Sequence, residues 1–241
     1  MILKKTLIAT ISALLLCGCA NSYLGFGSKG DVDPALEESG AKFFSESGFT
    51  SCLAGAGIGV AACAAADSDN MLACMLIAGF SGCAVGMTTN YVFDSVRSNY
   101  AKTEDQLDAI EKMVSQDVDA IKDVNKAASD LIEKDNHEID SLISKTNKTQ
   151  KDKEAINKKL LDVDANIAYI NEQLKGIDEK VKSYEYARNR YYEKVNDDLT
   201  HDDKAKLDEI DANIAILKNE RDSLYAMSEN YTLERKRLAH G

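Results

Sequence analysis

A strict heptad spacing of apolar residues between Ile156 and Val195 constrains this chain more than any other feature. The residues recur at alternating steps of four and three positions: Ile156, Leu160, Val163, Ile167, Ile170, Leu174, Ile177, Val181, Tyr184, Arg188, Tyr191 and Val195. Charged residues flank the series, and a helix places all its positions on one stripe, here called the seam. A repeat sustained over this length predicts a coiled-coil helix.

Two further series carry the same spacing on either side of this segment. The earlier one comprises Val96, Tyr100, Thr103, Leu107, Ile110 and Val114. The later one comprises Leu207, Ile210, Ile214, Leu217, Leu224, Tyr231 and Leu238, and Arg221 and Ser228 occupy other positions of its seam. The earlier and the central series are out of phase by one residue, which predicts a register slip within 114–139. In that interval Asn125 and Asp135 fall on the seam.

Residues 196–203 contain the clearest turn signal. They read Asn-Asp-Asp-Leu-Thr-His-Asp-Asp, and Thr200 with Asp203 three positions later is typical of a helix N-terminus. A short loop between two heptad helices predicts an antiparallel hairpin. Folding the chain about residue 201 would set Val195 opposite Leu207 and Tyr184 near Leu217.

Residues 144–153 are almost devoid of apolar side chains, yet they contain no Gly or Pro. We therefore expect one continuous helix over 94–197, about 150 Å long at 1.5 Å per residue, with a bend in this stretch as the alternative. The last helix would cover only about a third of such a length. The seam over 94–160 would then have to meet another chain or fold back on itself.

The composition agrees with an all-α chain and narrows its partners. One Pro, no Trp and 29% charged residues are typical of an extended helical protein rather than a compact α/β enzyme. The formal net charge of −11 becomes −13 once residues 1–18 are removed, since Lys4 and Lys5 are their only charges. This balance argues against nucleic-acid binding and against electrostatic adhesion to anionic lipids.

Residues 1–18 are predicted to be a secretory signal peptide. Lys4 and Lys5 precede an apolar run, Leu7 to Leu16, that is too short to span a membrane. The following Leu16-Cys17-Gly18-Cys19 resembles the lipobox of bacterial lipoproteins, which implies that Cys19 is acylated and becomes the first residue of the mature chain. Ala20 rather than Asp follows, which in that family favours the outer membrane, with the chain facing the periplasm. The acyl chains would anchor the protein, and no other cofactor is expected.

Residues 19–50 are expected to be the lipid anchor and a tether that contains one short helix. Asp33 before Pro34 places a capping residue ahead of a proline in the first helical turn. Phe43 and Phe44 would seat that helix on another part of the molecule.

Residues 51–93 are apolar and rich in small residues, apart from an interruption at 67–70. Gly55 with Gly59, and Gly82 with Gly86, lie four positions apart, which lets helix backbones approach closely. We predict a helical hairpin, and it resembles the glycine-zipper segments of envelope lipoproteins. Arms of about 16 and 23 residues leave open whether it enters a membrane or lies in water or at an interface.

Four cysteines lie on this predicted hairpin. A turn near 68–69 would bring Cys63 level with Cys74, and Cys52 level with Cys83. We therefore predict the disulfides Cys63–Cys74 and Cys52–Cys83, which the oxidising periplasm would permit. Free buried cysteines are the alternative, whereas the spacing and the lack of a nearby histidine disfavour a metal site.

No motif for catalysis or metal binding is found, so an enzyme is not expected. The three histidines, His137, His201 and His240, are scattered, and no phosphate loop, nucleophile elbow or zinc signature accompanies them.

One segment, 182–194, gathers tyrosine and basic residues. Tyr186, Arg190 and Tyr192 lie off the seam there and are candidates for contact with a partner, because Tyr and Arg are favoured at interface centres. A local helix face with intrahelical charge pairs is the alternative.

These features predict four segments: 1–18, 19–50, 51–93, and 94–241 with a turn near 197–203. The expected function is a non-enzymatic scaffold or spacer of the cell envelope that pairs with itself or with another envelope protein through its coiled coil. In broad plan the chain resembles the murein lipoprotein family, acylated helical trimers joined to peptidoglycan by a terminal lysine. This chain ends Leu-Ala-His-Gly, which puts covalent attachment in doubt, and peptidoglycan stays one of the candidate partners. The alternatives are an accessory lipoprotein of a secretion or efflux assembly, and a membrane-inserting glycine-zipper oligomer.

Overall fold

The computed structural model describes residues 30–46, 89–145, 147–195 and 199–240, and within these ranges all regular structure is helical. The helices are α2 (Pro34–Glu46), α5 (Tyr91–Asn99), α6 (Thr103–Ile143), α7 (Gln150–Val195) and α8 (His201–His240). The all-α class predicted from the sequence is therefore confirmed. α5 spans the boundary predicted between 93 and 94.

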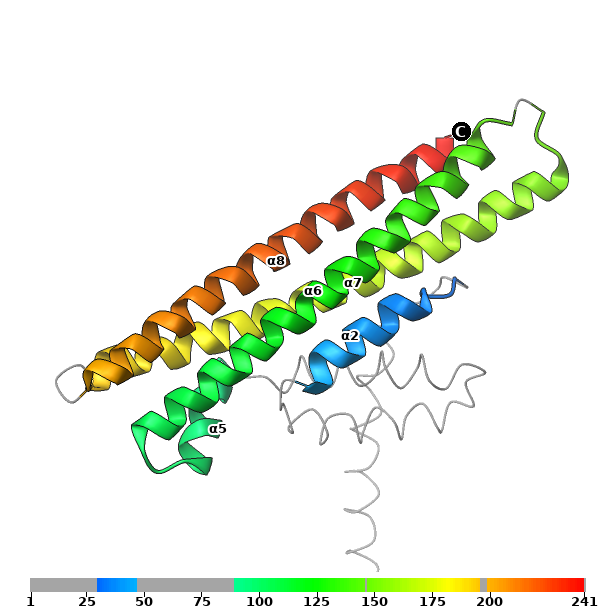
Figure 1. The fold of residues 1–241 in the computed structure, drawn as a ribbon. Coiled ribbons are helices and arrows are strands. Elements are labelled where there is room, and N and C mark those ends of the chain that lie inside the picture. Colours follow the sequence, from blue (N-terminus) through cyan, green and yellow to red (C-terminus); the bar gives the residue numbers. More distant parts are fainter. Residues whose placement is uncertain (1–29, 47–88, 146, 196–198, 241) are drawn as a thin grey trace, which may run out of the picture.

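The three long helices α6, α7 and α8 lie side by side as an elongated bundle (Figure 1). α8 runs parallel to α6, as ion pairs such as Arg237–Asp140 at 2.6 Å show. α7 runs antiparallel to α8, with Lys218 at 3.0 Å from Glu185 and Arg235 at 2.8 Å from Asp164. Their apolar seams face inward and form the main core.

The α7–α8 pair has the register predicted for the hairpin. Glu185 and Lys218 are next to Tyr184 and Leu217, the two residues predicted to lie level, and both of the latter are fully buried. The Thr200 hydroxyl and backbone N–H both bond Asp203 Oδ2, at 2.8 and 3.0 Å. The Asp203 N–H in turn donates to Thr200 Oγ1 at 3.1 Å, which completes the N-terminal cap of α8.

The expectation of one continuous helix over 94–197 is wrong, because α6 ends at Ile143 and α7 begins at Gln150. Thr149 caps α7 as Thr200 caps α8: its N–H and hydroxyl bond Asp152 Oδ2 at 2.9 and 2.6 Å. Lys145 adds an ion pair to Asp152 at 2.5 Å. The polar stretch therefore holds a turn, and α7 folds back along α6, which covers the seam of α6 within the chain.

A second break separates α5 from α6. Tyr100 has extended backbone, with φ −129° and ψ 130°, and its side chain is 43% exposed, so its predicted place on a continuous seam is wrong. Gln106 Nε2 donates to the Tyr100 carbonyl at 2.7 Å and stabilises the reversal. α5 packs back on α7, where the Val92 N–H donates to Ser183 Oγ at 3.0 Å.

The polar residues predicted on the seam of α6 are indeed in the core. Asn125 and Asp135 are 9% and 1% exposed, respectively. One series of buried positions in α6 alternates between steps of three and four: Leu107, Ile110, Val114, Asp117, Ile121, Val124, Ala128 and Leu131. Two steps of four then follow, to Asp135 and Ile139. This is the predicted register slip, and it lies inside the predicted interval.

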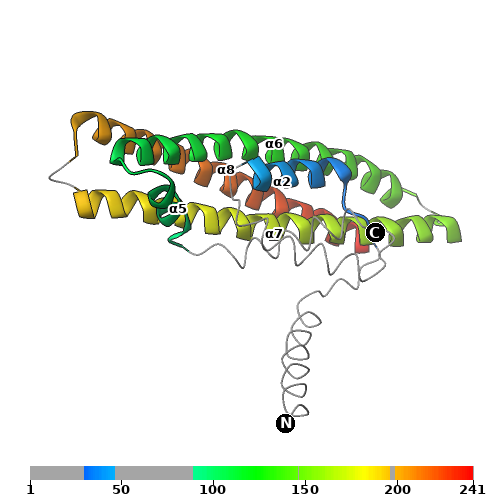
Figure 2. The same ribbon diagram turned by 90° about the horizontal axis from the view of Figure 1, so that it is seen from below.

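α2 lies along α6 and α7, on the side of the bundle away from α8 (Figure 2). Its start is the predicted one: Asp33 Oδ1 accepts the Ala35 N–H at 3.0 Å, and Pro34 is the first helical residue. Phe43 and Phe44 are buried and seat the helix on the bundle. Of the helices in the described ranges, none is both long enough and apolar enough to cross a membrane.

A proline scan distinguishes the turn at 144–149 from a continuous helix. Asn147→Pro, in the turn, should change the free energy of unfolding by less than about 1 kcal/mol, because no helical hydrogen bond is lost there. The control Ala226→Pro, exposed in the middle of α8, should cost about 3 kcal/mol or more. Urea unfolding followed by circular dichroism measures both, and equal losses would contradict the turn.

Candidate functional site

Most of the site residues predicted from the sequence lie outside the described ranges. These are the acylation site Cys19, the cysteines Cys52, Cys63, Cys74 and Cys83, and the glycines Gly55, Gly59, Gly82 and Gly86. Their predicted roles stay predictions.

The three candidate partner contacts on α7 have neighbours within the chain. Tyr186 packs edge-on against the Phe93 ring of α5 at 6.1 Å, and the Arg190 guanidinium lies over the same ring at 5.8 Å. Arg190 also pairs with Glu193 at 3.1 Å, one turn along the helix. Tyr192 Oη donates to Asp211 of α8 at 3.3 Å. These side chains thus hold α5 and α8 against α7, and contact with another protein stays a prediction.

The most unusual feature of the bundle is a fully buried ion pair. Lys180 Nζ lies 2.8 Å from Asp117 Oδ1, with side-chain exposures of 0% and 1%. Tyr184 Oη donates to the other Asp117 oxygen at 2.8 Å, and the three residues are here called the Lys180 network. Burial lowers the pKa of Lys180 to about 8, an effect that Asp117 opposes. Burial raises the pKa of Tyr184 well above 10, and the Asp117 charge adds to this.

A second polar network links α6, α7 and α8 further along the bundle. Asp135 accepts from Lys159 Nζ at 2.5 Å and, through its other oxygen, from Tyr231 Oη. Asn166 Nδ2 donates to Tyr231 Oη at 3.3 Å. These four residues are here called the Asp135 network. Burial raises the pKa of Tyr231, and the hydrogen bond to Asp135 raises it further.

Both networks end on the main chain of α2 or its N-terminal approach. Lys180 Nζ donates to the Phe43 carbonyl at 3.1 Å and also lies 4.1 Å from the centre of the Phe43 ring. At the other end, the Asp33 N–H donates to Asn166 Oδ1 at 2.7 Å. Between them, Tyr169 Oη donates to the Glu37 carbonyl at 3.2 Å. These bonds from α7 add to the packing of α2 against α6, with which its buried side chains share the main core.

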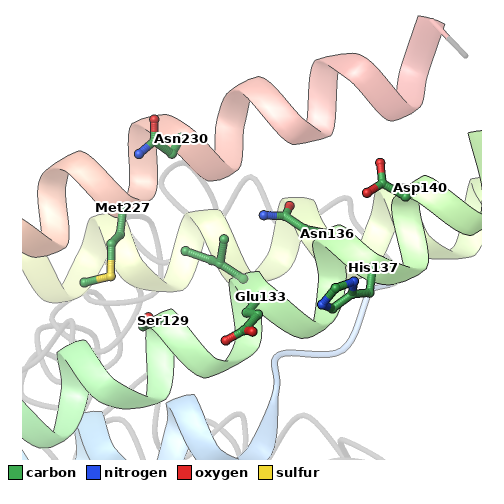
Figure 3. A pocket seen from close by; sticks show the side chains of 8 residues that line it. Ser129, Glu133, Asn136, His137, Asp140, Met227 and Asn230 are labelled. Carbon is green, nitrogen blue, oxygen red and sulfur yellow. The ribbon is translucent and has the colours of Figure 1, made fainter.

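A pocket lies between α6 and α8 (Figure 3). Most of the residues that line it are of polar type, including Glu133, His137 and Asp140 from α6 and Asn230 from α8, with Met227 beside them. Figure 3 shows these side chains along the two helices, with the polar ones spread over several turns. Within the described ranges, no three His, Cys, Asp or Glu side chains are grouped so that they could hold a metal ion.

The sequence held no clear signal for the polar residues that meet α2. Asn166, Gln173 and Lys180 follow one another at intervals of seven residues, beside the apolar seam, and all three are buried. Lys175 and Lys182 have the same spacing and are exposed, so the interval alone does not distinguish a covered polar face from a solvated one.

The described part of the chain is an up-down-up bundle of three long helices that cover one another's apolar seams, with α2 docked on one face. Comparisons of the chain with family models, with curated proteins and with solved structures gave no match.

Removal of one member of the buried ion pair should be far more harmful than removal of both. Lys180→Met leaves the Asp117 carboxylate buried without the ammonium, and we expect a loss of about 3–5 kcal/mol in the free energy of unfolding. The double variant Lys180→Met/Asp117→Asn removes both charges and should recover a large part of that loss. Chemical denaturation measures these two variants and the single variant Asp117→Asn, and additive losses would show that the two charges are not coupled.

The buried tyrosines should make the bundle lose stability in alkaline solution. Burial raises the pKa of Tyr184, Tyr169, Tyr231 and Tyr191, the last to about 12. Above pH 10 the unfolded chain loses these protons while the folded one keeps them, so the free energy of unfolding falls as pH rises. Tyr184→Phe should reduce that slope by about 1.4 kcal/mol per pH unit. Tyr225→Phe, at an exposed position, is the control and should change the slope less.

Proposed function

We propose that this chain is a non-enzymatic, lipid-anchored protein of the bacterial outer membrane whose helical bundle acts as a rigid periplasmic spacer or scaffold. The signal-like residues 1–18 and the lipobox-like Leu16-Cys17-Gly18-Cys19 support the compartment and the anchor. The helical bundle supports the spacer role, as the following observation explains.

The observation that carries the proposal is that the long helices cover one another's seams within a single chain. α7 has 46 residues and is therefore about 69 Å long, which sets the length of the rod. The two buried networks cross-link its helices, so a change in their register would separate charges from their partners. A rod of fixed length and register suits the role of a spacer.

In this arrangement a partner would bind the outer faces of the rod. α7 and α8 cover the seam of α6 within the chain, so this seam is not free to pair with another protein. A second copy, another envelope protein or peptidoglycan would therefore meet mainly charged surface, with isolated apolar side chains such as Tyr225 and Leu233 of α8. An accessory role in a secretion or efflux assembly is the second candidate, and it requires one defined partner on these faces.

The anchor is tested by Cys19→Ala in the full chain with its signal peptide. We expect the variant to lose incorporation of a clickable fatty acid, because the acylated thiol is absent, and to move from the membrane to the soluble fraction. Cys17→Ala is the matched control and should keep both the label and the membrane. Unlabelled wild-type protein would contradict the anchor. Membrane retention of Cys19→Ala would instead favour an inserting glycine-rich hairpin.

The outer faces are tested by photo-crosslinking in intact cells. Probes at Tyr225 and Leu233, which are 55% and 59% exposed, should crosslink to a second copy or to peptidoglycan-bound material. A probe at Leu224, which is fully buried beside Tyr225, is the control and should crosslink within the chain only. If both exposed probes captured one defined envelope complex, the spacer role would be wrong and the accessory role would replace it.

A further inference from the structure

One strip of the outer surface carries no charge, and it runs along α8. Seven exposed residues recur there at alternating steps of four and three positions, which places them on one stripe of the helix. They are Ala212, Ile216, Asn219, Ser223, Ala226, Asn230 and Leu233, and they are here called the outer strip. The two largest apolar members, Ile216 and Leu233, are 41% and 59% exposed. Figure 1 shows that α8 forms one edge of the bundle, so a partner can reach this face.

The outward face of α6 shows the usual composition of a solvated face in this bundle. One exposed heptad series there is charged at every position: Lys112, Asp119, Lys126, Glu133 and Asp140. The equivalent series of α8 runs from Ala212 to Leu233 and has no charge. Depletion of charged side chains distinguishes the centre of an interface from the remaining surface. The outer strip therefore has the composition of a contact surface.

A second copy of α8 that runs in the opposite direction matches the outer strip residue by residue. Pairing about a two-fold axis level with residues 224–225 places Ile216 level with Leu233 of the partner subunit, so the largest apolar side chains meet. In the same register Asn219 lies level with the partner's Asn230, and amides at such positions favour one register over others. A shift by one heptad would separate both pairs.

The charges that end the series favour the antiparallel orientation. Glu209 precedes the outer strip by three positions and Arg237 follows it by four, so each continues the heptad stripe, and both are exposed. In the antiparallel pair, Arg237 of one copy lies about 4.5 Å along the axis from Glu209 of the other. Parallel pairing would instead bring each charge level with its own copy, which is repulsive. Arg237 bonds Asp140 and Glu234 of its own chain through Nη2, and a guanidinium has further N–H groups for a third carboxylate.

One contact beside the outer strip opposes this pairing. Asp222 would lie about 3 Å along the axis from the partner's Glu229, on the same side of the strip. Arg221 holds the Asp222 carboxylate at 2.6 Å, which reduces the repulsion. We therefore expect a reversible dimer of chains that are each folded alone.

From these features we propose that two copies of the chain form an antiparallel homodimer through the outer strips of their α8 helices. Every contact occurs twice, because the interface is two-fold symmetric. Among the partners considered for the spacer, the dimer assigns the outer face of α8 to a second copy. It depends neither on the lipid anchor nor on the compartment.

Thiol crosslinking in cells that express the full chain tests the register. The double variant Ile216→Cys/Leu233→Cys sets a thiol of one copy level with a thiol of the other, so a short bis-maleimide should give a covalent dimer. In either single variant the two equivalent thiols lie about 26 Å apart along the axis, so no dimer above the wild-type background from the native cysteines is expected. Dimers from both single variants would show parallel pairing, and no dimer from the double variant would show no pairing. Either result overturns the proposal.

A matched pair of serine variants separates the interface from the fold. Ser223→Glu adds a carboxylate at the centre of the outer strip, and Ser115→Glu adds the same group at an exposed position of α6. Sedimentation equilibrium of the detergent-solubilised mature chain should show dimers for the wild type and for Ser115→Glu, and a dissociation constant at least tenfold higher for Ser223→Glu. Equal dissociation constants for the two variants, or a wild-type monomer at every concentration, would overturn the dimer. Fractionation of Cys19→Ala decides the anchor separately, so failure of the dimer and failure of the anchor are distinguishable.

Discussion

A long amphipathic helix cannot leave its apolar seam in water, and this constraint organises the whole molecule. α6 has 41 residues and buries a seam along its full length. α8 runs beside it in the same direction and α7 returns in the opposite one, so three seams close on one another within one chain. The turns between α6 and α7 and between α7 and α8 follow from this constraint. Without them, a second protein would have to cover the seam of α6.

Apolar burial alone would leave the register of such a bundle open, since every heptad resembles the next. The buried polar residues remove that freedom. A shift of α7 by one heptad along α6 would separate Lys180 from Asp117 and Lys159 from Asp135. Buried charges would then lack a partner of opposite sign, which is costly. A buried ion pair adds little net stability, so the value of these networks lies in selecting one arrangement among several that bury similar apolar area.

The features that the sequence predicts are encoded locally along the chain, whereas those that it does not predict depend on contacts between distant residues. Periodicity and local capping gave the all-α class, the α7–α8 register, the start of α2 at Asp33 and the buried position of Asp135, because each is encoded within a few turns of helix. The break at 144–149 has a signal of the same kind, because Thr149 and Asp152 repeat the spacing of Thr200 and Asp203, and such a cap can end a helix where Gly and Pro are absent. Phe43 and Phe44 predict that α2 is seated on another part of the molecule, but its place on the bundle is not encoded locally. Its bonds to α7 bring together residues more than 130 positions apart and use main-chain atoms common to any helix.

The two covered faces of α7 therefore have different physical consequences. Its apolar seam cannot be uncovered without exposing the main core, so it fixes the rod. Its polar strip meets α2: Lys180 Nζ donates to the Phe43 carbonyl, and the Asp33 N–H donates to Asn166 Oδ1. Lys180 and Asn166 also belong to the networks that cross-link the long helices. The same side chains that select the register of the rod therefore also position α2 on it.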